Sequence, residues 1–214
     1  MLRNLSIIEF MEKTASDSPV PGGGSVAALA AALAASLTEM VANLTIGKKD
    51  FEDVDREMQA IAKETRKYRD KLVQDIDKDA DSYKAVMAAY GMAKETDEEK
   101  RKRTTAILEA LKQAALVPLN VAGDAADLLE LAGNVAKKGN KNTITDAAVG
   151  VMMARTAVLA ALYNVKINLN FIKDPSFVNS ISKEVNALEK KILQREKELL
   201  AEIDLQINSK IIEV

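Results

Sequence analysis

The chain has 214 residues, of which 48% are apolar, and a net charge of −2 at pH 7; it contains no cysteine, histidine or tryptophan. These omissions exclude a thiol nucleophile, a Ser-His-Asp triad and a zinc site of the usual nitrogen and sulfur kind. The mixed charges are not typical of a nucleic-acid surface. Any catalysis must therefore use carboxylates, lysine, tyrosine, hydroxyls or backbone groups, and we predict no metal site.

Helical spacing of apolar residues recurs along the chain, whereas strand-like alternation does not, and aromatic residues make up only 4%. We therefore predict an all-α fold, a single domain over residues 1–214, built as an up-and-down-like bundle of about six helices. Several helices should be long and packed through small residues. We predict no signal peptide in the first residues, and we expect a cytoplasmic protein that does not enter a membrane.

The first helix is expected over residues 6–14, and the loop that follows reads Pro-Val-Pro-Gly-Gly-Gly-Ser over residues 19–25. It leads into a helix of small apolar residues, expected over 24–46. Glycine lets a ligand approach backbone amides, which are unpaired and partly positive at a helix start. The loop is therefore either a cradle for an anionic group or a mobile turn.

A long helix is expected over residues 53–93. It carries one stripe of side chains at alternating spacings of four and three, which places them on one face: Leu72, Ile76, Asp79, Tyr83, Val86 and Tyr90. Asp79 thus lies in an apolar stripe, where burial would raise its pKa and suit it to proton transfer. Alternatively, Asp79 forms a buried pair with a cation such as Arg155.

The neighbours of this stripe have simpler interpretations. Asp77 and Asp81 fall on the opposite side of the helix and are expected to be solvated. Tyr83 either belongs to the core or meets a flat ligand. Glu39, after an uncharged run, is expected to be a charge at a helix end.

The next helix begins near residue 96 and extends to about 116, where Pro118 kinks or breaks it before the pattern resumes to about 138. The turn over 139–142 reads Gly-Asn-Lys-Asn and precedes a helix expected to end near 172. Asn140, Lys141 and Asn142, with Asp146, either hold a polar ligand edge or form a solvated turn.

The last helix opens at Asp-Pro-Ser over 174–176 and carries an apolar stripe: Val178, Ile181, Val185, Leu188 and Ile192. Such a stripe packs on its own domain or forms a dimer seam.

Several of these motifs together resemble the cyclodeaminase/cyclohydrolase family, in order and over nearly the whole chain. They are the 19–25 loop with its alanine-rich helix, Glu-Met-Val-Ala-Asn-Leu-Thr at 39–45, Asp-Lys-Asp-Ala-Asp-Ser-Tyr at 77–83 through Ala-Ala-Tyr at 88–90, Val-Pro-Leu at 117–119, and Gly-Asn-Lys-Asn at 139–142 with Asp146.

The resemblance implies an all-helical fold, a homodimer or a higher assembly, and a tetrahydrofolate derivative as the substrate, with no cofactor beyond that substrate. It places Asp79 at the family's catalytic aspartate. Substrate-binding residues are then expected at Pro21, Gly22, Gly23, Gly24, Ser25, Tyr83, Asn140, Lys141, Asn142 and Asp146.

Two reactions fit this resemblance: hydrolysis of 5,10-methenyltetrahydrofolate to 10-formyltetrahydrofolate, and ring closure of formiminotetrahydrofolate with loss of ammonia. No formiminotransferase domain precedes the motifs in this sequence, so the first reaction is favoured. A folate-binding helical scaffold without catalysis is the third alternative.

Overall fold

The structure, a computed structural model, describes residues 1–212, with side chains described through residue 208. These residues form helices joined by short connections, without strands, which confirms the all-α prediction. The α-helices are α1 (Ile7–Thr14), α2 (Gly23–Asn43), α3 (Asp55–Tyr90), α4 (Asp97–Lys138), α5 (Ile144–Leu169) and α6 (Pro175–Ile212). Three short 3₁₀ helices are η1 (Leu2–Asn4), η2 (Lys49–Val54) and η3 (Lys141–Thr143).

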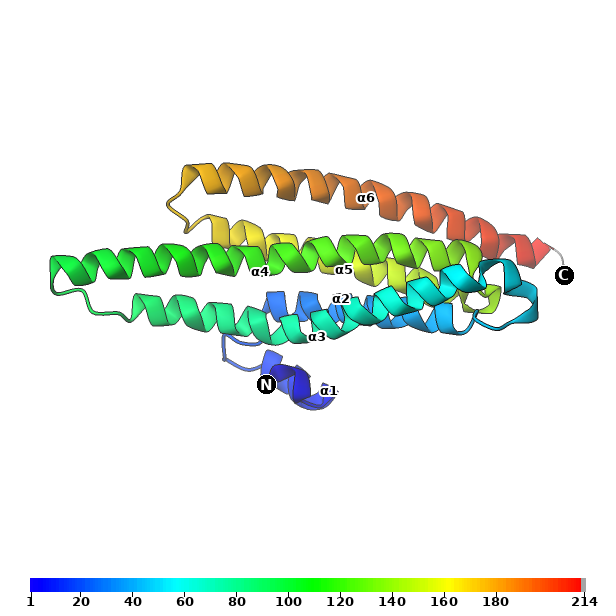
Figure 1. Cartoon of the computed structure of the whole chain (residues 1–214), viewed down its shortest axis with the longest axis horizontal. Helices are drawn as coiled ribbons and strands as arrows, with labels where there is room; N and C mark the ends of the chain where they lie inside the picture. The colour runs from blue at the N-terminus through cyan, green and yellow to red at the C-terminus, as the bar shows by residue number, and fades with distance from the viewer. Residues whose placement is uncertain (213–214) are drawn as a thin grey trace.

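Four long helices, α2 to α5, form the central bundle (Figure 1). Within it, α2 and α4 each pack against both α3 and α5. The last helix, α6, lies on the outside against α5 and α4, while α1 lies beside the bundle near the N-terminus (Figure 1). Phe10 is the residue through which α1 joins the core.

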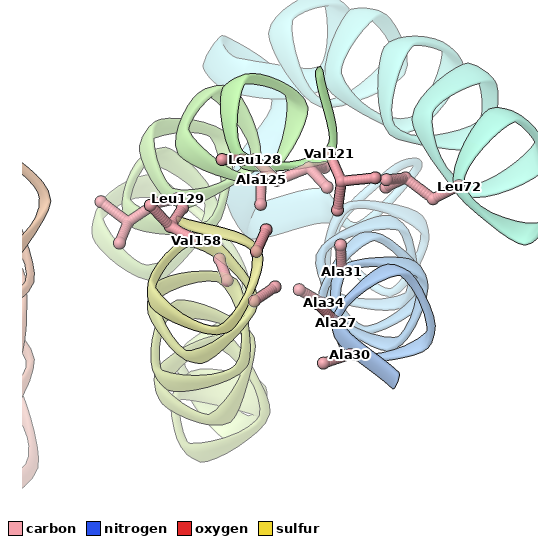
Figure 2. Packing of buried hydrophobic residues seen from close by; sticks show 14 of the residues in the cluster. Ala27, Ala30, Ala31, Ala34, Leu72, Val121, Ala125, Leu128, Leu129 and Val158 are labelled. Carbon is pink, nitrogen blue, oxygen red and sulfur yellow. The ribbon is translucent and has the colours of Figure 1, made fainter. Parts of the chain in front are cut away.

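Small side chains set the packing of the bundle. Alanines of α2, α4 and α5 are fully buried, among them Ala31, Ala125 and Ala157. Figure 2 shows alanines of α2 opposite Val158 and, across the bundle, larger side chains of α3 and α4. Because alanine favours helix and its side chain is small, an alanine-rich sequence forms long helices that can pack close together.

The predicted helix boundaries hold to within about three residues. Ser6 and Thr96 form capping boxes at the starts of α1 and α4, and Asp174 accepts a hydrogen bond from the Phe177 amide near the start of α6. α2 ends at Asn43 instead of residue 46, because the next residues form turns before Gly47. α4 continues through Pro118, which is therefore inside the helix and does not break it.

The apolar stripe of α6 packs on its own chain. Ile181, Val185 and Ile192 are buried, and the stripe continues to Leu199 and Ile203. Arg195, which interrupts it, pairs with Glu130 of α4 at 2.9 Å. The alternative of a dimer seam on this stripe is therefore wrong, since the stripe is already covered by α4 and α5.

Candidate active site

A pocket of about 370 Å³ opens where the glycine loop meets α3, α4 and the end of α5. Its lining is mostly apolar and aromatic, with a few polar groups, as is usual for a small-molecule site. The lining residues are Pro19, Val20, Gly22, Gly23, Gly24, Asp79, Ser82, Tyr83, Val86, Tyr90, Leu111, Ala114, Asn164, Ile167, Asn168 and Phe171.

Asp79 of α3 lies at the start of α2. The first amides of a helix have no intrahelical partner, and the N-cap residue Gly22 offers no side chain to satisfy them. The Asp79 carboxylate occupies this place instead, and the hydroxyl of the fully buried Ser25 donates to Oδ2 at 2.9 Å. Ser25 Oγ also lies 3.0 Å from the Ile76 carbonyl oxygen. An acid of α3 thus caps the start of α2 by direct contact.

Gly24 makes this close approach possible. A Cβ at position 24 would lie 2.5 Å from Asp79 Cγ and 2.8 Å from Oδ2, closer than real Cβ contacts occur. Any side chain there would displace the carboxylate. The glycine is therefore required by the neighbouring acid, and not by its own backbone angles.

Two opposing effects act on the pKa of Asp79. Burial raises the pKa above its ordinary value, whereas hydrogen bonds from the Ser25 hydroxyl and backbone amide lower it, and burial dominates. Among the described residues, no lysine or arginine pairs with Asp79. The alternative of an Asp79–Arg155 pair is wrong, because Arg155 pairs with Glu196 of α6 at 3.0 Å.

Other acids of α2 and α3 have cationic partners. Glu39, which lies near the end of α2 as expected, is 4% exposed and forms a buried ion pair with Arg66 and Arg69. Asp77 departs from the solvated position expected for it, since it accepts a hydrogen bond from the Leu2 amide at 2.6 Å and lies near Arg3. The N-terminal segment folds back over this side of α3 and covers it.

Aromatic side chains form one wall of the pocket. Tyr83 and Tyr90 line it, 40% and 43% exposed, and Phe171 lies at the end of α5. Tyr83 is thus available to a flat ligand and is not a core residue. The Arg103 guanidinium lies 5.9 Å from the centre of the Tyr90 ring.

The structure does not bring all predicted binding residues together. Gly22, Gly23, Gly24 and Tyr83 line the pocket, Ser25 holds Asp79 from behind it, and Pro21 is buried in the loop.

Residues 140–146 lie at the other end of α2, about 30 Å away by the rise of a helix of this length. Figure 1 shows this turn and the start of α2 at well-separated places along the bundle. The Asn140 amide donates to Thr45 Oγ1 at 2.8 Å, and Lys141 Nζ donates to the Lys137 carbonyl at 2.7 Å and to the side chain of Gln206. Asn142 is exposed, and Asp146 is half-buried in the first turn of α5. Within one chain, this segment is the turn between α4 and α5, and it packs against the residues that follow α2.

Asn164 and Asn168 of α5 are pocket residues that sequence reasoning missed. They are one turn apart on one face, a spacing that could have drawn attention to two amides on a mostly apolar helix.

Together, these features define an all-helical protein with an acid held at a glycine-rich helix start beside an aromatic pocket. A sequence model described as formiminotransferase-cyclodeaminase matches residues 6–187. The chain belongs to this family.

Three relatives show how far the likeness extends. The methenyltetrahydrofolate cyclohydrolase of Methylorubrum extorquens is 40% identical over 188 residues, which cover 88% of this chain and 90% of that protein. The formimidoyltransferase-cyclodeaminase of Rattus norvegicus is 33% identical over 187 residues, and the match spans only 35% of its length. The crystal structure of formiminotetrahydrofolate cyclodeaminase from Thermotoga maritima superposes with a TM-score of 0.81 at 34% identity, covering 95% of this chain and 99% of that one.

Proposed function

We propose that this chain is a one-carbon folate enzyme that hydrolyses 5,10-methenyltetrahydrofolate to 10-formyltetrahydrofolate. The observation that carries the proposal is Asp79, a half-buried acid without a cationic partner among the described residues, held by Ser25 at the edge of an aromatic pocket. The extensive match to a methenyltetrahydrofolate cyclohydrolase supports this substrate. No cofactor beyond the folate is needed, because the reaction is a hydration followed by ring opening.

In the proposed mechanism, water adds to the bridging methenyl carbon while Asp79 accepts one of its protons. The bond between that carbon and N5 then breaks as Asp79 returns the proton to N5. The hydroxyl proton leaves to solvent as the formyl carbonyl forms on N10. A raised pKa suits a carboxyl group to both steps, since it must accept and donate at neutral pH.

Ring closure of formiminotetrahydrofolate with release of ammonia is the second candidate, and the similarity to the Thermotoga maritima cyclodeaminase favours it. The same acid would then protonate the departing amine.

Side-by-side assays of both substrates decide between the two reactions. We expect loss of methenyltetrahydrofolate absorbance with turnover well above the uncatalysed rate, and less ammonia release from the formimino substrate. Preferred release of ammonia would contradict the proposed reaction. Tight folate binding without turnover of either substrate would instead indicate a scaffold.

We further propose that the enzyme is a homodimer joined through α2 and α5. Among the described residues, these two segments, Gly23–Asn43 and Lys141–Leu169, are long and apolar enough by composition to span a membrane, yet the bundle buries only 61% and 50% of their apolar windows. The uncovered faces carry apolar side chains at helical spacing: Val26, Leu33 and Met40 on α2, and Val149, Met152 and Tyr163 on α5. A second copy would cover such a face.

This pairing also gives residues 140–146 a role in the site. If α2 packs antiparallel to its copy across a two-fold axis, the 140–146 segment of each subunit approaches the glycine loop of the other. The predicted binding residues that one chain leaves apart would then meet between two chains.

We expect Leu33→Glu to weaken the dimer at least about 10-fold, because each copy would place a charge in an apolar contact. Sedimentation measures the result. Ile8→Glu on α1, which replaces an isoleucine that is 69% exposed on a helix outside α2 and α5, is the matched control and should leave the dimer intact. Wild-type protein that sediments as a monomer would contradict the pairing.

A further inference from the structure

Pro118 leaves one backbone carbonyl of α4 without its usual partner. In an α-helix, the Ala114 carbonyl would accept a hydrogen bond from the amide of residue 118, but proline has no N–H. The side chain of Asn168 on α5 provides the missing donor, with Nδ2 2.7 Å from the Ala114 oxygen. Ala114 and Asn168 both line the pocket.

This hydrogen bond determines which way the Asn168 amide faces. The reversed orientation would place Oδ1 against the Ala114 oxygen, two acceptors in contact with neither satisfied. Oδ1 is therefore the free end of the amide, and none of the described residues donates to it. A proline in α4 thus orients a side chain of α5.

Asn164, one turn earlier on the same helix, is oriented in the same sense. Its Nδ2 donates to the Ala160 carbonyl at 2.9 Å, and its amide lies against Gly23, where a Cβ would be 3.2 Å from Nδ2. Its Oδ1 likewise has no donor among the described residues. With Asp79 on α3, the pocket therefore offers three acceptor groups beside aromatic rings and apolar side chains.

We propose that Asn168 and Asn164 bind the N–H edge of a flat heterocycle, and that Pro118 is a positioning residue that acts through Asn168. The inference rests on the proposed function and deepens it. The reduced pterin of a folate carries N–H groups at N8, N3 and the 2-amino group, and stacking of its face on Tyr83 or Phe171 would leave that edge facing the two amides. Acceptors oriented in this way would bind the ring within the pocket that Asp79 also lines.

The test is a double-mutant cycle on KM. Asn168→Leu removes the acceptor, and we expect KM for methenyltetrahydrofolate to rise about 10-fold or more, with kcat within about 2-fold of wild type. Pro118→Ala supplies an amide that competes for the Ala114 oxygen, so KM should rise about 3-fold to 10-fold. Its melting temperature should be equal or higher, because alanine is the better helix former. In the double variant, KM should equal that of Asn168→Leu alone, since Pro118 acts only through Asn168.

Gly123→Ala, on the same helix with open space around the new Cβ, is the control for a change in α4 that does not reach Asn168. Wild-type KM in Asn168→Leu would overturn the proposal. The proposal would also be overturned if Pro118→Ala raised KM by the same factor in the Asn168→Leu variant as in the wild type. Calorimetry with tetrahydrofolate distinguishes this failure from failure of the proposed function. If wild type neither binds tetrahydrofolate nor turns over either substrate, the function fails; if wild type and Asn168→Leu bind it equally, only the role of Asn168 fails.

Discussion

Asp79→Asn is expected to lower kcat for methenyltetrahydrofolate at least about 100-fold, the range of a lost general acid–base group. The amide keeps the shape of the carboxyl group and still accepts a hydrogen bond from Ser25, but it cannot accept a proton from water or return one to N5. Substrate binding should change much less than kcat. Initial rates from the methenyl absorbance, measured over a range of substrate concentrations, give both quantities.

The same variant should be as stable as the wild type or more stable at pH 8. Burial raises the pKa of Asp79 in the folded state above its value in the unfolded chain. Ionisation therefore disfavours the folded state as the pH rises from the ordinary value toward the raised one, and this cost stays constant at higher pH. Asparagine carries no such cost. Any advantage of the variant in melting temperature should vanish below the ordinary pKa of an aspartate, where both side chains are neutral.

Asp81→Asn is the matched control on the same helix. Asp81 is exposed and, among the described residues, forms an ion pair with Lys84 alone, at 2.8 Å, so its removal should leave both kcat and stability nearly unchanged. An Asp79→Asn enzyme with full activity would refute the assigned role. Reduced activity accompanied by a large loss of melting temperature would point to a structural acid instead.

Gly24→Ala is expected to lower kcat about 100-fold although it removes no functional group. The new methyl group would occupy the space of the Asp79 carboxyl, and a displacement of about 1 Å in a reacting group is enough for a loss of this size. Crowding should also reduce the free energy of unfolding by about 1–3 kcal/mol. Steady-state rates and denaturant unfolding measure the two effects.

The Gly123→Ala variant again serves as the comparison, because no atom of the described residues lies within 4 Å of a Cβ at that position. It should keep full activity and gain about 0.5–1 kcal/mol, the usual benefit of replacing a glycine inside a helix. Gly24→Ala with wild-type kcat would show that Asp79 need not lie against the start of α2. The proposed mechanism would then lose its geometric basis.

From the sequence, the candidate site could be predicted only where a local pattern marks it, at the glycine loop of residues 22–24 and on one face of α3. Spacing along α3 placed Asp79 and Tyr83 on one face, and the structure has both at the pocket. The same spacing placed Asp77 in solvent, which was wrong because the N-terminal segment covers it. Asn164 and Asn168 were missed, because the orientation of their amides depends on contacts with other helices, Gly23 for Asn164 and the Ala114 carbonyl for Asn168.

The sequence by itself determined the helices: alanine content, capping residues and apolar spacing are local properties, and each acts within a few residues of chain. Only the tertiary structure decided which helix ends meet. It placed the acid of α3 over the start of α2, paired Arg155 with Glu196 and set residues 140–146 at the far end of the bundle. The physical reason is that the packing of long helices places residues more than forty positions apart in contact, and no local pattern encodes that register.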